Sequence, residues 1–186
     1  MGAGTESAQL VALEDLRRYT DAVGAALARG VVVLATGNAM ELFGGSITSP
    51  GGTVHAGLGL FPFRTTVSDT ARIQGDCLAV GAATGQTAVG FVNKASQTTE
   101  VAHPLFHMEH GPGNAADTAE DGAWEGSFYG THLIGPLLMK NPHVNAYFTE
   151  LLCRRAGLPY QAQDCPHEQR AYEVTLRALQ ERFRQQ

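Results

Sequence analysis

The stretch that decides the fold runs from Val31 to Gly44 and reads VVVLATGNAMELFG. It opens with five apolar residues, three of them β-branched, which is typical of a buried strand in a parallel sheet. The break at Thr36, Gly37 and Asn38 leads into a short apolar helical turn, so the stretch predicts a strand, a sharp elbow and a helix. An elbow of this kind lifts backbone N–H groups above the carboxyl edge of a sheet, where α/β enzymes place a nucleophile.

The elbow itself contains neither cysteine nor serine, the usual nucleophiles at such a position. Asn38 suits a helix N-cap, and Glu41 follows three residues later, where its side chain would reach back to the Asn38 amide in a capping box. The sequence therefore predicts where chemistry would take place without providing a familiar reactive side chain.

The composition indicates an ordinary globular protein. Its 186 residues suit a single domain over residues 1–186, long enough to bury a core. A net charge of -5 and a pI near 5.8 argue against nucleic acid or an anionic membrane surface as the main partner. No stretch approaches the roughly 20 apolar residues of a membrane span, and no signal-peptide pattern opens the chain. Three cysteines without CxxC spacing favour a reduced, cytoplasmic protein.

Helical periodicity over residues 8–29 ends at Gly30, a residue suited to the end of a helix, and leads into the buried strand. This pair is an α-to-β unit of a parallel sheet. No strand precedes the helix, although parallel strands are normally joined through a crossover helix. We therefore expect a sheet that is unusually small, that lacks its first βαβ portion, or that receives this portion from another chain.

The rest of the chain alternates between extended and helical patterns. We expect an extended segment at residues 53–63 and two antiparallel strands at 71–80 and 87–93. These are followed by a surface loop at 109–126, a short strand at 128–133 and two helices at 142–157 and 166–184. Asn141 is expected to cap the first of these helices, with Pro142 as its first residue.

Four segments, in their order and spacing, resemble one family. They are the elbow, TVHAGLGL at 53–60, VGFVN at 89–93 and GTHLIGPLLMKNP at 130–142. Together they resemble the class I glutamine amidotransferase domains of the cobyric acid synthase (CobB/CobQ-like) type, over about residues 2–152. The likeness is greatest to the glutaminase subunits of lipid II isoglutaminyl synthases. It implies an α/β fold of the flavodoxin-like, class I amidotransferase kind, with a parallel or mixed sheet flanked by helices.

The resemblance also implies a function. Members of this family release ammonia from glutamine, and the glutaminase subunits pass it to a Mur-ligase-like synthase subunit that amidates the peptidoglycan precursor lipid II. The wider family implies cobyrinate-type amidation, in cobalamin biosynthesis, instead. Neither activity of the domain implies a cofactor or a metal.

This sequence departs from the family pattern at two positions, that of the nucleophile and that of the base. The family elbow reads roughly Cys-Gly-Gly-Tyr-Gln-hydrophobic-Leu-Gly, and its Cys attacks glutamine with a His from a Gly-Thr-Tyr-Leu-His-Gly-Pro segment as base. Here the Cys position falls at Thr36, or at Gly37 if the elbow is gapped differently, and the His position falls at Ile134. His132 stands where the family has Tyr. It either leans toward the pocket, since residues two apart in a strand share a face, or is a hydrogen-bonded histidine at the strand end.

Four residues are predicted to bind glutamine or a related small ligand: Gly37, Asn38, Arg72 and Asn93. Arg72 falls where the isoglutaminyl synthase subunits carry a pocket arginine that would clamp a substrate carboxylate. The alternative is that Arg72 is one more charge on a half-exposed strand. Asn93 begins the pair Asn93-Lys94, which replaces an Asn-His pair of the family.

Two hypotheses about activity follow. The chain is either a working glutaminase with Thr36 as nucleophile, or a non-catalytic binding or scaffolding subunit that keeps the fold and the partner surface. A threonine hydroxyl needs a strong nearby base, and the expected base is Ile134. Loss of both members of such a pair lowers a rate by about 10⁶-fold in protease triads, so the sequence favours the degenerate subunit.

A histidine-rich segment raises a separate question. His103, His107 and His110 would share one face of a helix, as a transition-metal site requires. The Gly-Pro-Gly at 111–113 favours a solvated loop instead, and we predict no metal.

Overall fold

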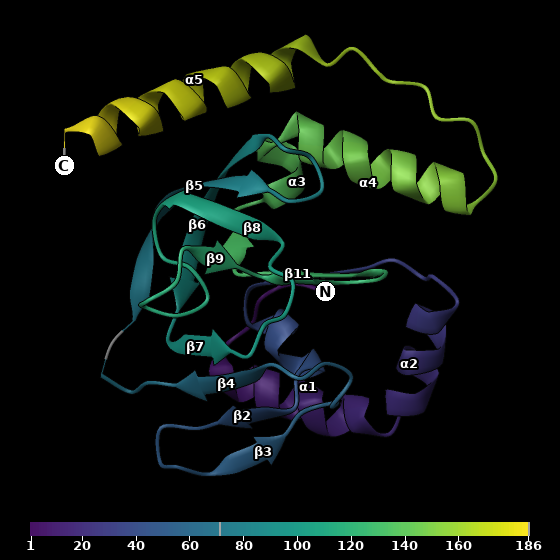
Figure 1. The fold of residues 1–186 in the computed structure, drawn as a ribbon, viewed down its shortest axis with the longest axis vertical. Coiled ribbons are helices and arrows are strands. Elements are labelled where there is room, and N and C mark those ends of the chain that lie inside the picture. The colour runs from purple at the N-terminus through teal and green to yellow at the C-terminus, as the bar shows by residue number, and fades with distance from the viewer. Residues whose placement is uncertain (71, 186) are drawn as a thin grey trace.

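Helices cover one end of the molecule, and in the other half helices and short strands lie beside one another (Figure 1). The computed structural model describes residues 1–70 and 72–185. The helices at the covered end are α3 (Leu137–Lys140), α4 (Pro142–Arg155) and α5 (Pro166–Arg184), and those in the other half are α1 (Glu6–Arg17) and α2 (Thr20–Ala28). The predicted fold class, a mixed α/β fold with helices flanking the strands, is confirmed. In the described part of the chain, no helix combines the length and the hydropathy that crossing a membrane requires.

Within the described residues the strands form three sheets, a division that the sequence did not predict. The three-stranded sheet has the order β1 (Val33–Thr36), β11 (Phe128–Thr131), β10 (Ala123–Glu125). The five-stranded sheet has the order β12 (Leu133–Ile134), β6 (Thr87–Lys94), β5 (Ile73–Gly81), β8 (Phe106–His110), β9 (Glu120–Asp121). The four-stranded sheet has the order β3 (Val54–Ala56), β2 (Ser46–Thr48), β4 (Arg64–Val67), β7 (Ser96–Thr99).

The buried strand predicted at the start of the elbow stretch is β1, which pairs in parallel with β11. The register places Thr36 opposite Thr131, so the elbow lies beside the end of β11. Phe43, just beyond the elbow, packs on Phe128 with 4.6 Å between ring centroids, and both rings are buried. Apolar packing therefore fixes the elbow against β11.

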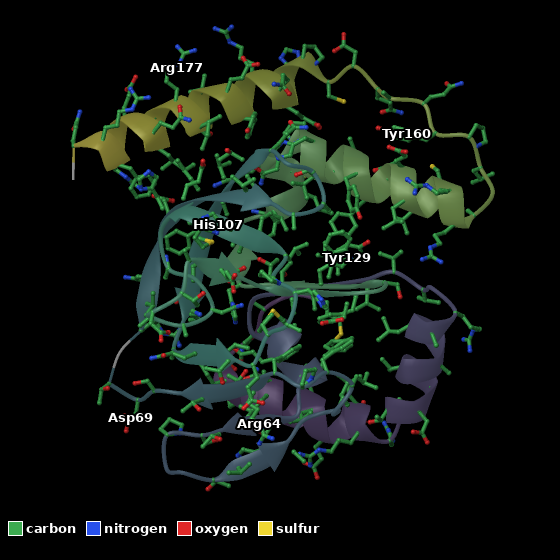
Figure 2. All side chains as sticks on the ribbon, in the orientation of Figure 1. Arg64, Asp69, His107, Tyr129, Tyr160 and Arg177 are labelled. Carbon is green, nitrogen blue, oxygen red and sulfur yellow. The ribbon has the colours of Figure 1, made fainter. Side chains whose placement is uncertain are left out.

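Tyr129 of β11 joins the three-stranded sheet to α4 (Figure 2). Its hydroxyl lies 3.0 Å from that of Tyr147, and its ring meets Phe148 edge to face at 5.0 Å between centroids. At the same end of the molecule as α4, helix α5 covers β5 and β6. Its Leu179 packs with Leu78 and Val89.

The single helix predicted over 8–29 is two helices. The first ends at Arg17, and α2 begins at Thr20, whose hydroxyl donates to the Arg17 carbonyl at 2.9 Å. A threonine that bonds to a nearby backbone carbonyl competes with helix continuation, which accounts for the break. Gly30 follows the end of α2 with a φ of +84°, a left-handed conformation that favours glycine.

The surface loop predicted over 109–126 is wrong in part. This segment contributes the end of β8, all of β9 and β10, and two buried polar side chains, Asn114 and Asp121. Asn114 accepts a hydrogen bond from the Gly122 amide at 2.9 Å and donates to the Gly122 carbonyl at 3.0 Å. Because internal partners satisfy these side chains, a polar composition did not indicate exposure here.

The two antiparallel strands are confirmed as β5 and β6; Ala71, the first residue predicted for them, lies outside the described residues. The extended segment over 53–63 contains only the short strand β3. The last two helices are confirmed, although α4 ends at Arg155, two residues before the predicted end at Gly157.

Asn141 was predicted to cap α4, but its side chain makes no cap hydrogen bond. It points instead to β6, where its Oδ1 accepts from the Val89 amide at 2.7 Å and its Nδ2 donates to the Val89 carbonyl at 2.9 Å. A third bond, from Nδ2 to the Leu137 carbonyl at 2.8 Å, ties α3 to the same point. One fully buried amide therefore holds the α3–α4 corner on the five-stranded sheet.

We expect Asn141→Ala to lower the free energy of unfolding by about 3 kcal/mol, because it leaves buried backbone groups of Val89 without partners. Urea denaturation measures the change. Asn145→Ala in the same helix is the control and should cost less than about 1 kcal/mol, since no hydrogen bond of its side chain is seen. Equal losses in the two variants would contradict this role for Asn141.

Candidate functional site

The elbow has its apex at Gly37. Thr36 ends β1, and Gly37 begins η1 (Gly37–Phe43), a 3₁₀ helix, with a φ of +62°. A left-handed φ at a strand-to-helix turn, which glycine adopts without strain, is the backbone conformation of a nucleophile elbow. Of the two candidate positions, Gly37 therefore has the backbone of a nucleophile, and as a glycine it has no side chain to react.

The space beside Gly37 is also filled. A Cβ atom placed on Gly37 would lie 2.5 Å from the Cβ of Ala3 and 3.3 Å from Ile134 Cγ2. The first distance is shorter than carbon atoms tolerate, so a side chain at the apex would require the segment at Ala3 to move.

The capping box predicted for the elbow is wrong. Asn38 faces the start of the chain, where its Oδ1 accepts from the Gly4 amide at 2.9 Å and its Nδ2 donates to the Gly4 carbonyl at 3.0 Å. Glu41 turns into the interior, where Gln9 of α1 donates to its carboxylate at 2.6 Å. Hydrogen bonds to other parts of the fold therefore hold both side chains away from the start of η1.

Thr36 and Ile134 line one pocket beside the elbow, with a volume of about 570 Å³. We call it the elbow pocket; its other lining residues are Met1, Ala3, Leu34, Gly135, Pro136, Leu137, Leu138, Met139 and Asn145. The structure thus brings together the two positions that the family resemblance predicted for nucleophile and base. None of the residues lining this pocket has a charged side chain, so no side chain there supplies an acid or a base.

His132 does not line the elbow pocket. Its side chain is 1% exposed, and its Nδ1 lies 2.9 Å from Asp121 Oδ1. Its Nε2 makes no hydrogen bond but faces Glu41 Oε1 at 3.4 Å. Of the two interpretations of His132, this geometry agrees with a histidine held at the strand end by buried partners.

Of the two carboxylates that face His132, that of Asp121 is the more firmly hydrogen-bonded to the end of β11. Its Oδ2 accepts from the Thr131 hydroxyl at 2.6 Å and from the His132 amide at 3.1 Å, in addition to the bond at Nδ1. Burial raises the pKa of the Asp121 carboxyl, but these donors and the charges of His132 and Lys94 outweigh burial and hold the pKa below its ordinary value. Asp121 is therefore an anion.

Glu41 is held in the same way from other elements. Gln9 donates to one oxygen, and the Ser96 hydroxyl of β7 donates to the other at 2.5 Å. Burial raises the pKa of the Glu41 carboxyl, whereas His132, Ser96 and Gln9 lower it and prevail. Burial and Lys94 lower the pKa of His132, but Asp121 and Glu41 raise it above its ordinary value, so this site favours the imidazolium.

Lys94 completes this group. It is 4% exposed, and its Nζ donates to the carbonyls of Gly113 and Asn114 at 2.6 and 2.7 Å. Burial lowers the pKa of Lys94, while Asp121 and Glu41 raise it; burial prevails. With Lys94 protonated, two cations and two anions share the interior without net charge. We call these four residues the charge network: Glu41, Lys94, Asp121 and His132.

The predicted ligand residues lie together in a second, smaller pocket of about 30 Å³, enough for about one water molecule. We call it the polar pocket; Arg72, Asn93 and Asn38 line it, and Gly37 does not. Arg72 Nη1 donates to Asn93 Oδ1 at 2.9 Å, and Nη2 binds the carboxylate of Glu6 in a short ion pair. Arg72 thus already holds a carboxylate, which belongs to the chain itself.

The histidine-rich segment does not form a metal centre. His103 pairs with Glu125 at 2.9 Å, and His107 and His110 lie on β8 (Figure 2 labels His107). The His110 ring stacks on Phe183 of α5. Among residues 1–70 and 72–185, no three His, Cys, Asp or Glu side chains are placed to hold a metal ion.

The sequence did not predict the charge network. Glu41 was visible as an acid within the apolar run AMELF, but helix capping explained it locally. Asp121 lay in a predicted surface loop, and Lys94 was noted only as part of a departure from the family pattern. Burial of these side chains depends on contacts between distant segments, which no local pattern reveals.

We expect Asp121→Asn to lower the free energy of unfolding at neutral pH by about 3–5 kcal/mol, because it leaves His132 as a buried cation with one partner fewer. The lowered pKa of Asp121 stabilises the fold above about pH 4, and this contribution is lost as the pH falls through the folded-state pKa. Denaturant titrations between pH 3 and 7 should therefore show a shallower acid dependence in the variant.

The control for this experiment is Asp76→Asn. Asp76 pairs with Arg182 at 2.7 Å in a half-exposed ion pair, which is worth less than about 1 kcal/mol. If the two variants lost the same free energy of unfolding, Asp121 in the charge network would contribute no more to stability than a half-exposed ion pair does.

Comparison with known proteins identifies the family of this chain. Residues 1–142 match the CobB/CobQ-like glutamine amidotransferase domain. The chain is 30% identical over 168 residues to the lipid II isoglutaminyl synthase (glutamine-hydrolyzing) subunit GatD of Staphylococcus aureus (strain N315), an alignment that covers 90% of this chain and 68% of that protein. The chain therefore belongs to the family of CobB/CobQ-like glutamine amidotransferase domains.

Proposed function

We propose that this chain is a glutamine amidotransferase-like subunit in the amidation of lipid II, that it works beside a Mur-ligase-like synthase subunit, and that it does not hydrolyse glutamine itself. The observation that carries the loss of hydrolysis is the elbow, where Gly37 stands at the apex and Ile134 replaces the base. The lipid II assignment rests on the 30% identity to the staphylococcal subunit.

The chemistry of the elbow pocket supports this proposal. Hydrolysis of a side-chain amide needs an activated nucleophile and a group that accepts its proton. Thr36 is the one hydroxyl side chain that lines the pocket, and its Oγ1 makes a 3.5 Å contact to the Met1 carbonyl. His132 is no substitute base, because it does not line the pocket and both of its nitrogens face carboxylates.

The polar pocket is too small for glutamine as it stands, but it presents groups suited to the carboxylate of glutamine or a related small ligand once Glu6 moves away. Arg72 and Asn93 present a guanidinium and an amide side by side, which suits a ligand carboxylate. Glu6 occupies the guanidinium in this structure, and both partners are about half exposed. A ligand carboxylate would take the place of Glu6 at modest cost, because half-exposed ion pairs contribute little.

The retained fold supports a role as a partner subunit. A likeness over 90% of the chain, with both catalytic positions changed, favours a role for the fold beyond glutamine hydrolysis. We therefore propose a scaffolding or ligand-sensing subunit, located in the cytoplasm, where its three cysteines remain free thiols. Cobyrinate-type amidation is the second candidate; the family description favours it, but the relative found does not.

Glutamate release from glutamine tests the loss of activity. We expect the purified chain, alone or mixed with its Mur-ligase-like partner, to release no glutamate above background, and Thr36→Ala to behave identically. The chain should still unfold cooperatively and bind the partner in sedimentation experiments. Turnover that disappears in Thr36→Ala would overturn the proposal and show that a hydroxyl at the elbow suffices.

Rebuilding the catalytic pair tests the role of the apex. We expect Gly37→Cys/Ile134→His to stay poorly active, because Ala3 obstructs a Cβ at position 37. Adding Ala3→Gly should raise glutamate release by about tenfold over the double variant, since overpacking costs about 1–3 kcal/mol and 1.4 kcal/mol is a factor of ten. Equal rates with and without Ala3→Gly would show that the clash at Ala3 is not limiting.

A further inference from the structure

The charge network joins the elbow to the corner where β11 passes into β12. Glu41 comes from η1, Asp121 from β9, and His132 lies at the corner itself. Their side chains are at most 1% exposed. Thr36, just before η1, and Ile134, two residues after His132, both line the elbow pocket. The network therefore lies behind two walls of that pocket.

The two ends of the network are held unequally. Asp121 accepts three hydrogen bonds from residues 131 and 132, so it stays with the corner. Glu41 makes no hydrogen bond to His132, although its Oε1 lies 3.4 Å from Nε2. Its hydrogen bonds go to Gln9 of α1 and Ser96 of β7 instead. The attraction between Glu41 and the imidazolium is thus the weaker link, and it depends on charge.

We propose that Glu41, His132 and Asp121 form a pH-sensitive latch: the protonated ring holds η1 against the β11–β12 corner, and loss of its proton releases η1 while Asp121 keeps the ring. The release would loosen the elbow pocket. This inference rests on the buried geometry alone and is independent of the proposed function.

The tautomer of the neutral ring gives the latch its direction. Asp121 accepts at Nδ1, so the proton that leaves is the one on Nε2. A bare Nε2 then presents its lone pair to the Glu41 carboxylate at a starting distance of 3.4 Å. Two acceptors facing each other without a hydrogen between them repel, and the burial of both groups keeps water from screening them. Glu41, and with it η1, is the part that must move.

The other charged and titratable groups around the ring set the pH window. Lys94 of β6 lies close enough to disfavour the imidazolium, and burial lowers its own pKa. Burial and the charges of Asp121 and Asp76 raise the pKa of the Cys77 thiol of β5 to about 12, so this thiol stays neutral. Because the pKa of His132 is raised, the stabilisation by the closed latch is fully present below about pH 6.5, the ordinary pKa of histidine, and is lost as the pH rises through the raised pKa.

The acid side behaves in the opposite sense. The pKa values of Glu41 and Asp121 are lowered, so the carboxylates stay ionised until the pH falls through their folded-state values. The latch is therefore closed from about pH 4.5, above the ordinary pKa of both acids, to at least the ordinary pKa of histidine, about 6.5. Alkaline release involves η1 alone, whereas acid release involves both ends of the network.

Two measurements on the intact chain test the latch. Ring-carbon NMR shifts of His132 follow its titration directly, and amide hydrogen exchange, normalised by intrinsic rates, follows residues 37–44. We expect His132 to titrate above its ordinary pKa. We also expect protection of residues 37–44 to fall by about tenfold for each pH unit beyond it, as for one linked proton, while residues 128–131 change little.

Glu41→Gln is the informative variant, because its neutral amide can donate to a bare Nε2. It should lower the pKa of His132 and remove the alkaline loss of protection at residues 37–44. Glu100→Gln, in an exposed pair with Arg64, is the control and should behave as wild type. Should Glu41→Gln fail to fold, the wild-type measurements decide alone.

Three outcomes would overturn the latch. The first is a His132 that titrates at or below its ordinary pKa. The second is protection at residues 37–44 that is independent of pH across the titration of His132. The third is a Glu41→Gln protein that folds and loses protection at alkaline pH as the wild type does.

Discussion

The pairing of the buried His132 ring with Asp121 and Glu41 is the constraint on which the rest of the site depends. Removing two carboxylates, the His132 ring and the Lys94 ammonium from water is costly, and the cost is offset only where each group meets an opposite charge or a hydrogen-bond partner. Five elements therefore have to meet at one place: α1, η1, β6, β7 and the β9–β12 segment. The elbow keeps its shape because Glu41, four residues beyond its apex, is anchored there.

The same region differs from the family pattern at the positions of the nucleophile and the base. A glutaminase needs a reactive side chain at the apex and a free base beside it, and here a glycine and an isoleucine take these places. The histidine nearest to the missing base is already committed to two carboxylates. Its ring is paired within the interior of the protein, while the elbow pocket has no charged side chain and the polar pocket holds the groups suited to a ligand.

The predictions from sequence were confirmed where local patterns decide the structure and were wrong where contacts between distant segments decide it. The strand and turn at Val31–Asn38, the β5–β6 hairpin and α5 follow from periodicity and were predicted. The break between α1 and α2, the anchoring of Asn141 on β6 and the burial of Asp121 were not, because each depends on a hydrogen bond that propensity does not encode. Of the site residues, Thr36 and Ile134 were predicted to be neighbours and share a pocket, whereas Glu41, Lys94 and Asp121 were missed.

By itself, the sequence determined the fold class, the family and the absence of cysteine and histidine at the positions that match the nucleophile and the base of the family, because residue identity and local pattern suffice for these. Only the tertiary structure decided that Gly37 is the apex of the elbow, that Ala3 fills the space beside it and that His132 faces inward. The physical reason is that the backbone conformation at the turn, steric contact and the pairing of buried charges depend on segments far apart in the chain. The pattern of any one segment does not contain them.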